Sequence, residues 1–266
     1  MPAEPSLAVI IVSYNVRGDL DRCLRSLQTV TPPGPMTVTV VDNRSADGTL
    51  AWLRETWPAV QALDAGGNVG FARANNLGIR ATASDLVLLL NPDTEVPPDA
   101  LVTLTAALLG DDRTAIVGPR LVDAADRPEL SFGPMMSPWG EFTQRRLLRA
   151  VEAGASWAVA RVERHTRQAG PRDWVSGACL LARRTDLEAV GLLDERYFMY
   201  TEDVDLCAAV RARGRVVRFV PAATVRHLRG RSGATAPAAT ERRRRESQLA
   251  FYRKHHPAWA PLLGWW

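Results

Sequence analysis

The carboxylate that follows the apolar run LVLLL is the first candidate for chemistry in this 266-residue chain. Asn91-Pro92-Asp93 comes directly after Leu86–Leu90, so Asp93 is expected at the edge of a sheet. A carboxylate there can hold a divalent cation against a diphosphate, because such cations take oxygen ligands and keep phosphates in their shell. A proline-containing turn with aspartate as its cap explains the same tripeptide, and these residues alone leave both interpretations open.

A second acidic cluster is Thr201-Glu202-Asp203-Val204-Asp205, which precedes an expected helix over 206–213. Acids at a helix start stabilise it by about 0.3–1 kcal/mol each, so one or two need no further function. Three acids within four residues, just after the aromatic stretch 197–200, indicate a general base. His227 follows a predicted strand over 216–220 and its extension 223–225. Imidazole is a common metal ligand, although a lone histidine is more often structural.

The elements that position these residues alternate between strands and helices. Short β-branched or apolar runs predict strands at 7–13, 36–41, 60–64 and 86–90. Helical spacing predicts helices at 19–30, 48–55, 71–81 and 100–109. This alternation predicts an α/β domain with a mainly parallel sheet. Beyond Ile116 it weakens, with strands expected at 115–118 and 173–182 and helices near 141–150 and over 242–256.

Polar residues follow all four of the first strands, at the sheet edge where ligands gather in open α/β folds. Aspartate and asparagine are common in turns, so only their joint placement is a signal. The residues are Ser13, Tyr14 and Asn15; Asp42, Asn43, Ser45 and Asp47; Gly66, Gly67, Asn68 and Gly70; and Asn91, Pro92, Asp93 and Thr94.

Composition is that of a globular protein, with 46% hydrophobic and 23% charged residues. Three cysteines are too few for a disulfide framework or a zinc ribbon, which indicates a reduced, cytoplasmic setting. No apolar run approaches the roughly 20 residues of a membrane span. The net charge is +4, but residues 211–256 carry +11 and the remainder −7. This basic end favours contact with phosphates of a ligand or of anionic lipid, with a solvated basic helix as the alternative.

Seven ordered motifs resemble the glycosyltransferase family 2 superfamily, in the branch that includes bacterial rhamnosyltransferases. The resemblance runs from about Leu7 to Ser232. The motifs are VIIVSYN, VVDNRSADGT, NVGFARANNLGI, LLLNPDT, DWVSGACLLARR, LDERYFMYTEDVDLC and VRHLRGRS.

The resemblance implies a GT-A fold and an inverting glycosyltransferase. One domain would span residues 1–240, with a Rossmann-like nucleotide-binding half at about 1–115 and an acceptor-binding half at 116–240, followed by a basic, tryptophan-containing tail at 241–266. The donor would be a dTDP- or UDP-linked sugar, rhamnose being one candidate. The acceptor would be a hydroxyl of a glycan or a lipid-linked glycan, in cell wall or polysaccharide synthesis.

Matching positions carry the family's roles onto this sequence. Asp203 would be the general base, and Asp93 and His227 would bind Mn²⁺ or Mg²⁺ at the diphosphate. The expected nucleotide-binding residues are Val12, Tyr14, Asn15, Asp42, Asn43, Asn68 and Arg73. The residues expected at the donor sugar and acceptor are Asn91, Trp174, Ser176, Gly177 and Glu202. Asn91 replaces the first aspartate of the commoner Asp-x-Asp motif, which weakens the expected metal affinity because an amide is neutral.

Two other functions compete with sugar transfer. A non-catalytic relative that only binds sugar nucleotides or glycans predicts loss of one key carboxylate, yet Asp93 and Asp203 are both present. Nucleic-acid binding through Arg242–Arg245 lacks interleaved aromatic residues or a recognition helix, so no nucleic-acid partner is expected. The tail either contacts the inner face of the cell membrane or packs on the domain or a second subunit. Both alternatives, and the oligomeric state, stay open.

Overall fold

The computed structural model describes residues 4–32, 34–228 and 237–260. Its centre is a nine-stranded sheet in the order β3-β2-β1-β4-β10-β6-β11-β5, with β8 paired to β11 off this path. The strands are β1 (Leu7–Ser13), β2 (Met36–Asp42), β3 (Gln61–Asp64), β4 (Leu86–Leu90), β5 (Thr94–Glu95), β6 (Thr114–Val122), β8 (Gly170–Arg172), β10 (Cys179–Arg183) and β11 (Val216–His227). A separate two-stranded sheet pairs β7 (Phe132–Gly133) with β9 (Trp174–Val175).

The first four strands along the sheet, β3 to β4, are all parallel. Leu7 of β1 lies opposite both Met36 and Leu86, so the carboxyl ends of these strands reach the same edge. Strand β10 is antiparallel to β4 and β6 and joins the two halves, and β11 runs parallel to β6. The predicted α/β class is therefore confirmed, and the strand expected over 173–182 is divided into β9 and β10 by the turn at 176–178.

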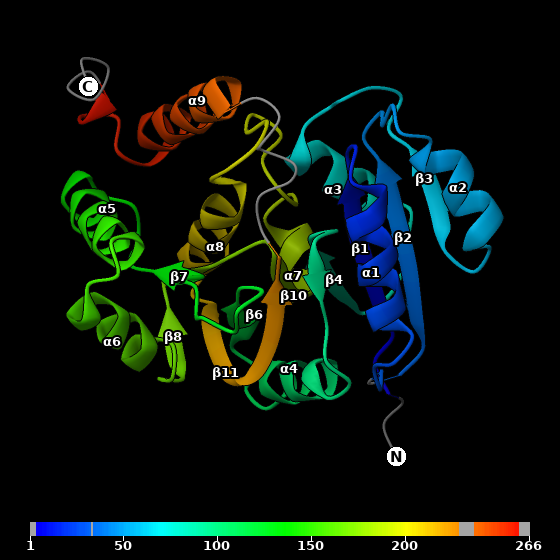
Figure 1. The fold of residues 1–266 in the computed structure, drawn as a ribbon, viewed down its shortest axis with the longest axis horizontal. Coiled ribbons are helices and arrows are strands. Elements are labelled where there is room, and N and C mark those ends of the chain that lie inside the picture. The colour runs from blue at the N-terminus through cyan, green and yellow to red at the C-terminus, as the bar shows by residue number, and fades with distance from the viewer. Residues whose placement is uncertain (1–3, 33, 229–236, 261–266) are drawn as a thin grey trace.

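Helices cover both faces of the sheet (Figure 1). On one face pack α1 (Arg17–Leu27), α2 (Thr49–Thr56) and α4 (Ala100–Leu109), and on the other α3 (Phe71–Arg80), α7 (Arg184–Ala189) and α8 (Glu202–Ala212). In β1, Val9 and Ile11 belong to the first core and Ala8 and Ile10 to the second. This period of two explains why the run LAVIIVS is apolar throughout: both faces are buried.

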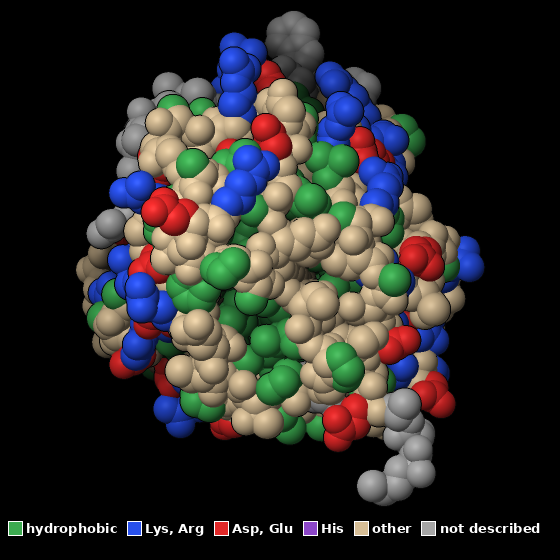
Figure 2. Space-filling model, turned by 90° about the vertical axis from the view of Figure 1, so that its right-hand side faces the viewer, with side chains coloured by type: hydrophobic (Ala, Val, Ile, Leu, Met, Phe, Trp, Pro, Cys, Tyr) green, Lys and Arg blue, Asp and Glu red, His purple; other side chains and the backbone are tan. Residues whose placement is uncertain are grey.

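Three further helices lie beside the C-terminal part of the sheet, away from β1 to β3: α5 (Pro138–Glu152), α6 (Ser156–His165) and α9 (Pro237–His255). The α9 helix packs on the domain through Phe251 and Tyr252, which are both fully buried. At the opposite end of the molecule, the face formed by α2 and β3 shows interspersed acidic and basic side chains, with apolar side chains in its lower half (Figure 2).

One predicted boundary is wrong where the chemistry is expected. The helix predicted over 206–213 begins at Glu202 and ends at Ala212, so the acidic cluster forms its first turn instead of preceding it. Acidic side chains in a first turn face the partial positive charge of the helix N-terminus. Periodicity missed this turn because its residues are mostly polar. The short α6 helix was also missed, whereas β1, β4 and α4 have their predicted bounds.

Candidate active site

Asp203 lies in the first turn of α8, where two backbone N–H groups orient its carboxylate. The N–H of Gly177 donates to Oδ2 and the N–H of Val204 donates to Oδ1, each at 2.8 Å. Burial raises the pKa of the Asp203 carboxyl above its usual range, and these N–H donors oppose that shift. A fixed carboxylate with a raised pKa is suited to accept a proton near neutral pH.

The loop before Asp203 has an uncommon backbone conformation. Tyr200 and Thr201 both adopt left-handed φ values, 70° and 73°, which side chains with a Cβ rarely adopt. The loop is held from two sides, because Ser247 of α9 donates to the Met199 carbonyl and Phe71 of α3 donates to the Phe198 carbonyl. Strain at such a position persists only where surrounding contacts hold it. The start of α8 is therefore positioned by α3 and α9 together.

Glu202 is the neighbour of Asp203 and is more deeply buried. Its Oε2 has no hydrogen-bond partner among the described residues. Burial, and secondly the nearby charge of Asp203, raise the pKa of Glu202 well above its usual range. Glu202 therefore favours the protonated form, in which it can donate a hydrogen bond, while Asp203 remains the better proton acceptor of the two.

The turn between β9 and β10 brings three predicted residues to Asp203. A Cβ on Gly177 would lie 3.2 Å from the Asp203 Cβ, so glycine permits this close approach. Ser176 is fixed by its N–H, which donates to the Ser131 carbonyl at 2.7 Å. Trp174 donates from Nε1 to the Pro134 carbonyl at 2.9 Å. These contacts explain why this turn is rigid beside the carboxylate.

Asp93 and His227 are brought together from distant parts of the chain. The distance from His227 Nε2 to Asp93 Oδ1 is 3.3 Å, and Asn91 Nδ2 is 3.4 Å from the same nitrogen. On the other side of the ring, Nδ1 is 3.2 Å from Oε2 of Glu129, which is buried. Burial opposes charge on His227, but the two carboxylates outweigh it and raise its pKa to about 9. Glu129 was missed because it lies in an irregular segment without periodicity.

The donor set fits a divalent cation only in part. Asp93 Oδ1 and His227 Nε2 are separated by about the distance expected of adjacent ligands on one ion, given metal–ligand distances near 2.0–2.2 Å. Among the described residues, no group of three or more His, Cys, Asp or Glu could hold a metal ion. A cation here would therefore rely on these two donors and on oxygen ligands from a diphosphate, as the neutral Asn91 implies.

One turn connects the two carboxylate sites. The N–H of Asn91 donates to the Ala178 carbonyl at 2.9 Å, and Ala178 follows Gly177, the residue that orients Asp203. Leu90 is paired with Cys179 at the same point of the sheet. The 176–178 turn therefore links the segment that carries Asp93 to the first turn of α8, which carries Asp203.

Several predicted nucleotide-binding residues converge at the ends of β1 and β2. Asn43 donates from Nδ2 to Asn68 Oδ1 at 3.0 Å and accepts at Oδ1 from the Val69 N–H at 2.8 Å. Asn15 accepts at Oδ1 from the Ala46 N–H at 2.6 Å, which ties the two loops together. Asn43 and Asn68 therefore hold their two loops together directly, and Asn15 ties its loop to the one after β2 through Ala46.

Among these residues, Asp42 has a buried side-chain oxygen that accepts no hydrogen bond from the described residues. Its Oδ2 accepts from the Ser45 N–H at 3.0 Å, while Oδ1 is buried with no partner among the described residues. Ser13 lies opposite Asp42 in the pairing of β1 with β2. Its hydroxyl is also buried and has no partner among the described residues. Val12 is buried at this edge and Tyr14 is exposed. A buried carboxylate oxygen without a hydrogen bond is costly, so Oδ1 of Asp42 is available to a donor group.

Arg73 is not brought to these residues by any described contact. It extends from α3 with 59% of its side chain exposed, and its charged neighbour is Glu195, with Nε to Oε2 at 3.8 Å. Its helix is preceded by the N-cap residue Gly70, where φ is +88° and a Cβ would lie 2.5 Å from the Phe198 carbonyl oxygen. Its role at the nucleotide stays a prediction.

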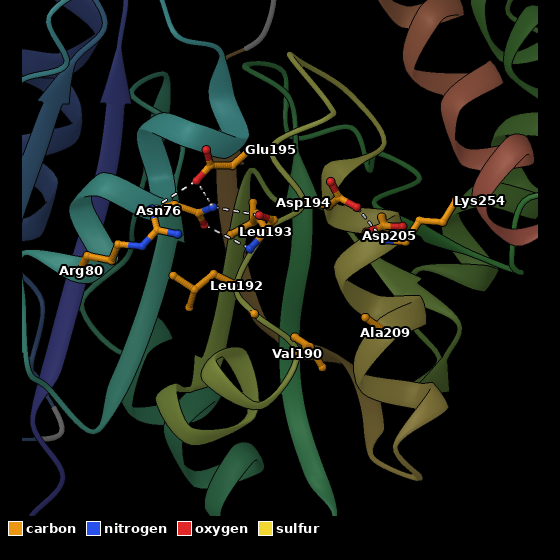
Figure 3. Close-up of a pocket in the computed structure, with 11 residues that line it drawn as sticks. Asn76, Arg80, Val190, Leu192, Leu193, Asp194, Glu195, Asp205, Ala209 and Lys254 are labelled. Atoms are coloured by element: carbon orange, nitrogen blue, oxygen red, sulfur yellow. Dashed lines mark hydrogen bonds and ion pairs between the residues drawn. The ribbon is translucent and has the colours of Figure 1, made fainter.

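Asp205, the third acid of the cluster, has a different environment. It is buried, accepts from the Tyr197 hydroxyl at 3.1 Å and lies 2.6 Å from His255 Nε2. Together with Lys254 it lines a cavity of about 320 Å³, shown in Figure 3. In this view two carboxylates of the cavity already have partners. Asp194 accepts from Lys254, and Glu195 accepts from Asn76 and Arg80. None of the predicted site residues lines this cavity.

Comparison with known proteins agrees with this geometry. The family model described as glycosyltransferase-like family 2 matches residues 4–260. The N-acetylglucosaminyl-diphospho-decaprenol L-rhamnosyltransferase of Mycobacterium tuberculosis is 33% identical over 96% of this chain and 87% of its own length. The low-salt glycan biosynthesis hexosyltransferase Agl10 of Haloferax volcanii is 28% identical over 77% of this chain and 61% of its own length.

Solved structures show the same fold. The mannosyltransferase PcManGT of Pyrobaculum calidifontis, in complex with GDP-Man and Mn²⁺, superposes with a TM-score of 0.63 at 20% identity, over 99% of this chain and 69% of that one. GalNAc-T7 with UDP, GalNAc and Mn²⁺ gives a TM-score of 0.63 at 16% identity, over 88% of this chain but 45% of that one. The predicted GT-A fold is confirmed. In the described part of this chain, no helix has the length and apolar character needed to cross a bilayer.

Proposed function

Because this chain belongs to glycosyltransferase-like family 2, we propose that it transfers a sugar, with inversion, from a nucleoside-diphosphate sugar to a hydroxyl of a lipid-linked glycan. The observation that carries the proposal is the placement of the Asp203 carboxylate, oriented by Gly177, across one turn from Asp93. A base on one side and a diphosphate site on the other are the two groups that direct displacement at an anomeric carbon requires.

In the proposed reaction, Asp203 accepts the proton of the acceptor hydroxyl as that oxygen attacks the anomeric carbon of the donor. The new glycosidic C–O bond forms while the bond from the anomeric carbon to the diphosphate oxygen breaks. The nucleoside diphosphate departs with the bonding electron pair, and the anomeric configuration inverts. Protonated Glu202, buried beside Asp203, is placed to hold a sugar hydroxyl or the acceptor.

Asp93 and His227 are the residues that would hold Mn²⁺ or Mg²⁺, and the cation would neutralise the charge on the leaving diphosphate. Glu129 holds the other ring nitrogen of His227 and so orients the imidazole toward Asp93. Asn91 is fixed by its backbone bond to Ala178 and presents its amide to the same nitrogen. These residues position the diphosphate relative to the base.

The free Oδ1 of Asp42 supports a dTDP- or UDP-linked donor. Thymine and uracil each carry a ring N–H between two carbonyl groups, and this N–H can donate to the buried oxygen. Val12 and Tyr14 would then frame the ring, one buried and one exposed. The activity named for the mycobacterial relative makes rhamnose and a lipid-linked N-acetylglucosaminyl diphosphate the first donor sugar and acceptor to test.

The test begins with thermal unfolding of the full chain in the presence of UDP, dTDP, GDP and their sugars, with and without Mn²⁺. A ligand at about 100 times its Kd stabilises the folded state by about 2.7 kcal/mol, which gives a clear shift. The donors that bind are then incubated with a short-chain lipid diphosphate acceptor, and NMR determines the anomeric configuration of the product. Donor binding without transfer to any acceptor would support a non-catalytic binding protein, and retention of configuration would refute the mechanism.

A further inference from the structure

The helices α5 and α6 form a hairpin at one end of the molecule, on the side away from α2 and β3 (Figure 1). None of the residues of α5 is buried, and α6 buries only Ala158 and Val162. Glu141 faces α9, where Gln248 and Tyr252 donate to its carboxylate. The hairpin is therefore attached along one side and presents the other to its surroundings.

The exposed side of this hairpin carries aromatic residues that a solvated surface does not need. Trp139 is 75% exposed and Trp157 is 62% exposed, the highest values among the large hydrophobic side chains described. Phe142 is 45% exposed and lies 5.8 Å from Trp139 between ring centroids. Large aromatic side chains exposed as a group mark an interaction surface.

Arginines extend this aromatic surface at helical spacing. On α5, Arg146 and Arg149 follow Trp139 by seven and ten residues, so they share its face. On α6, Arg161 and Arg164 follow Trp157 by four and seven residues. The guanidinium of Arg146 lies over the ring of Phe142, 5.8 Å from its centroid. Both helices therefore present tryptophan and arginine together.

The charge of this surface is positive and largely unneutralised. Residues 138–167 contain six arginines and three glutamates. Two of the glutamates are occupied, Glu141 by α9 and Glu163 by Arg120 and Arg167. Among the described residues, none of the remaining arginines of the hairpin forms an ion pair; these are Arg145, Arg146, Arg149, Arg161 and Arg164.

We propose that the exposed α5–α6 surface docks on an anionic phospholipid bilayer. Tryptophan favours the interfacial region of a bilayer, and arginine pairs with lipid phosphates through its planar fork. An acidic protein partner would satisfy the arginines but would not require a tryptophan more than 60% exposed on each helix. The chemistry of the bilayer surface matches both features at once.

The hairpin is placed to bring the protein to an acceptor held in a membrane. Of the observations in favour of bilayer docking, only this placement depends on the proposed function. Helix α5 begins directly after Met135 and Met136, which pack with Trp174 against Tyr197 and Val204. Val204 follows Asp203 in the first turn of α8. The surface that contacts lipid would thus continue into the side of the site where the acceptor hydroxyl must enter.

The sequence analysis left two alternatives for the tail at residues 241–266, contact with the membrane or packing on the domain or a second subunit, and this assignment places membrane contact elsewhere. In the structure, Arg243 stacks over Phe198, and Arg242 and Arg244 pair with Glu246 and Glu241. Trp259 is 39% exposed and stacks on His256. Trp265 and Trp266 lie outside the described residues. The described cations of the tail are thus mostly engaged within the protein.

The test is co-sedimentation of the full chain with vesicles of phosphatidylcholine and phosphatidylglycerol, against vesicles of phosphatidylcholine alone. The variants are Arg146→Glu with Arg149→Glu, and Trp139→Ala with Trp157→Ala. The control for charge is Arg54→Glu with Arg213→Glu, an equal charge change at exposed positions outside the hairpin. The control for the tail is Trp259→Ala.

We expect wild type to bind the anionic vesicles and to be released by salt, and each hairpin variant to lower the partition at least about tenfold. Both controls should stay within about twofold of wild type. No retention of wild type, equal loss in the charge control, or loss confined to Trp259→Ala would overturn the assignment. Unchanged thermal unfolding confirms that the variants fold. Donor binding is measured separately by calorimetry. If the proposed function fails, the vesicle experiment therefore still tests docking on the bilayer.

Discussion

Lys254, the only lysine of the chain, donates from Nζ to Oδ2 of the buried Asp205 at 2.8 Å. This bond joins the C-terminal helix α9 to the first turn of α8, two residues after Asp203. The same ammonium group donates to Asp194 at 2.8 Å, in the loop that precedes α8. The basic C-terminal helix therefore supports the turn that carries the proposed base.

Removing the charge of Asp205 should destabilise the protein. We expect Asp205→Asn to lower the free energy of unfolding by about 1–3 kcal/mol, because Lys254 and His255 would lose a buried carboxylate partner. Solvent screens part of this interaction, since Lys254 is partly exposed. Asp194→Asn is the matched control, since Asp194 also binds Lys254 but is more exposed, and it should cost less. Denaturant unfolding measures both, and equal losses would contradict a special role for Asp205.

Asp203→Asn should abolish most transfer while leaving donor binding intact. The amide is nearly isosteric but cannot accept the acceptor proton, and loss of a general base costs about 10²–10⁴ in rate. The measurements are kcat for transfer and donor affinity by calorimetry. A variant that keeps more than half of the wild-type turnover would exclude Asp203 as the base.

Gly177→Ala should lower kcat through the position of Asp203. The added Cβ would lie 3.2 Å from the Asp203 Cβ, so the carboxylate must move by a few tenths of an ångström. We expect a loss of about tenfold in kcat with little change in donor affinity, since small misplacements of a catalytic group are costly. Gly18→Ala is the control, because a Cβ there meets nothing within 4 Å. Unchanged kcat in Gly177→Ala would mean that the backbone bond to Asp203 is unimportant.

Asp93→Ala should remove any strengthening of nucleoside diphosphate binding by Mn²⁺ or Mg²⁺. In the proposed function its carboxylate, three residues after the end of β4, would be the charged oxygen ligand of the cation. Asn91→Asp should preserve or tighten metal-dependent binding, because it adds a second charged oxygen. Calorimetry with and without EDTA decides the matter. Equal wild-type affinity in both conditions would indicate that arginine side chains, rather than a cation, neutralise the diphosphate.

Glu202 should make stability depend on pH. Its pKa is raised in the folded state by burial and by Asp203, so the folded protein binds this proton more tightly than the unfolded chain. The free energy of unfolding should therefore rise as pH falls through the folded pKa, until the ordinary glutamate range near 4.5 is reached. Glu202→Gln should remove this slope and raise stability at neutral pH. Parallel slopes in both proteins would show that Glu202 titrates normally.

The sequence alone determined the N-terminal half of the sheet closely. The runs at 7–13 and 86–90 are apolar on both faces, and their strands have the predicted bounds. The polar residues after them meet at one sheet edge because parallel strands end there together. Asp42, Asn43 and Asn68 could therefore be predicted as neighbours from local pattern alone. Their roles at the nucleotide stay predictions.

Tertiary structure decided the environment of each acid in the first turn of α8. Glu202, Asp203 and Asp205 are equivalent in sequence as three acids in one helical turn. Packing buries Glu202 without a partner for Oε2, gives Asp203 two N–H donors, and directs Asp205 to Lys254 and His255. These differences come from segments far apart in the chain, and no local periodicity encodes them.

The same reason explains Glu129 and the α5–α6 surface. Glu129 reaches His227 across 98 positions, from a segment with no helical or strand pattern. The sequence shows tryptophan and arginine both in residues 138–167 and in the tail. The structure separates them: the packing of α9 through Phe251 and Tyr252 brings Lys254 to Asp205, and Arg242 and Arg244 pair with glutamates of their own helix, whereas the hairpin arginines stay exposed. Periodicity in a sequence predicts which residues of a helix or strand are buried. Which charged side chains form ion pairs depends on how the helices and strands pack against one another.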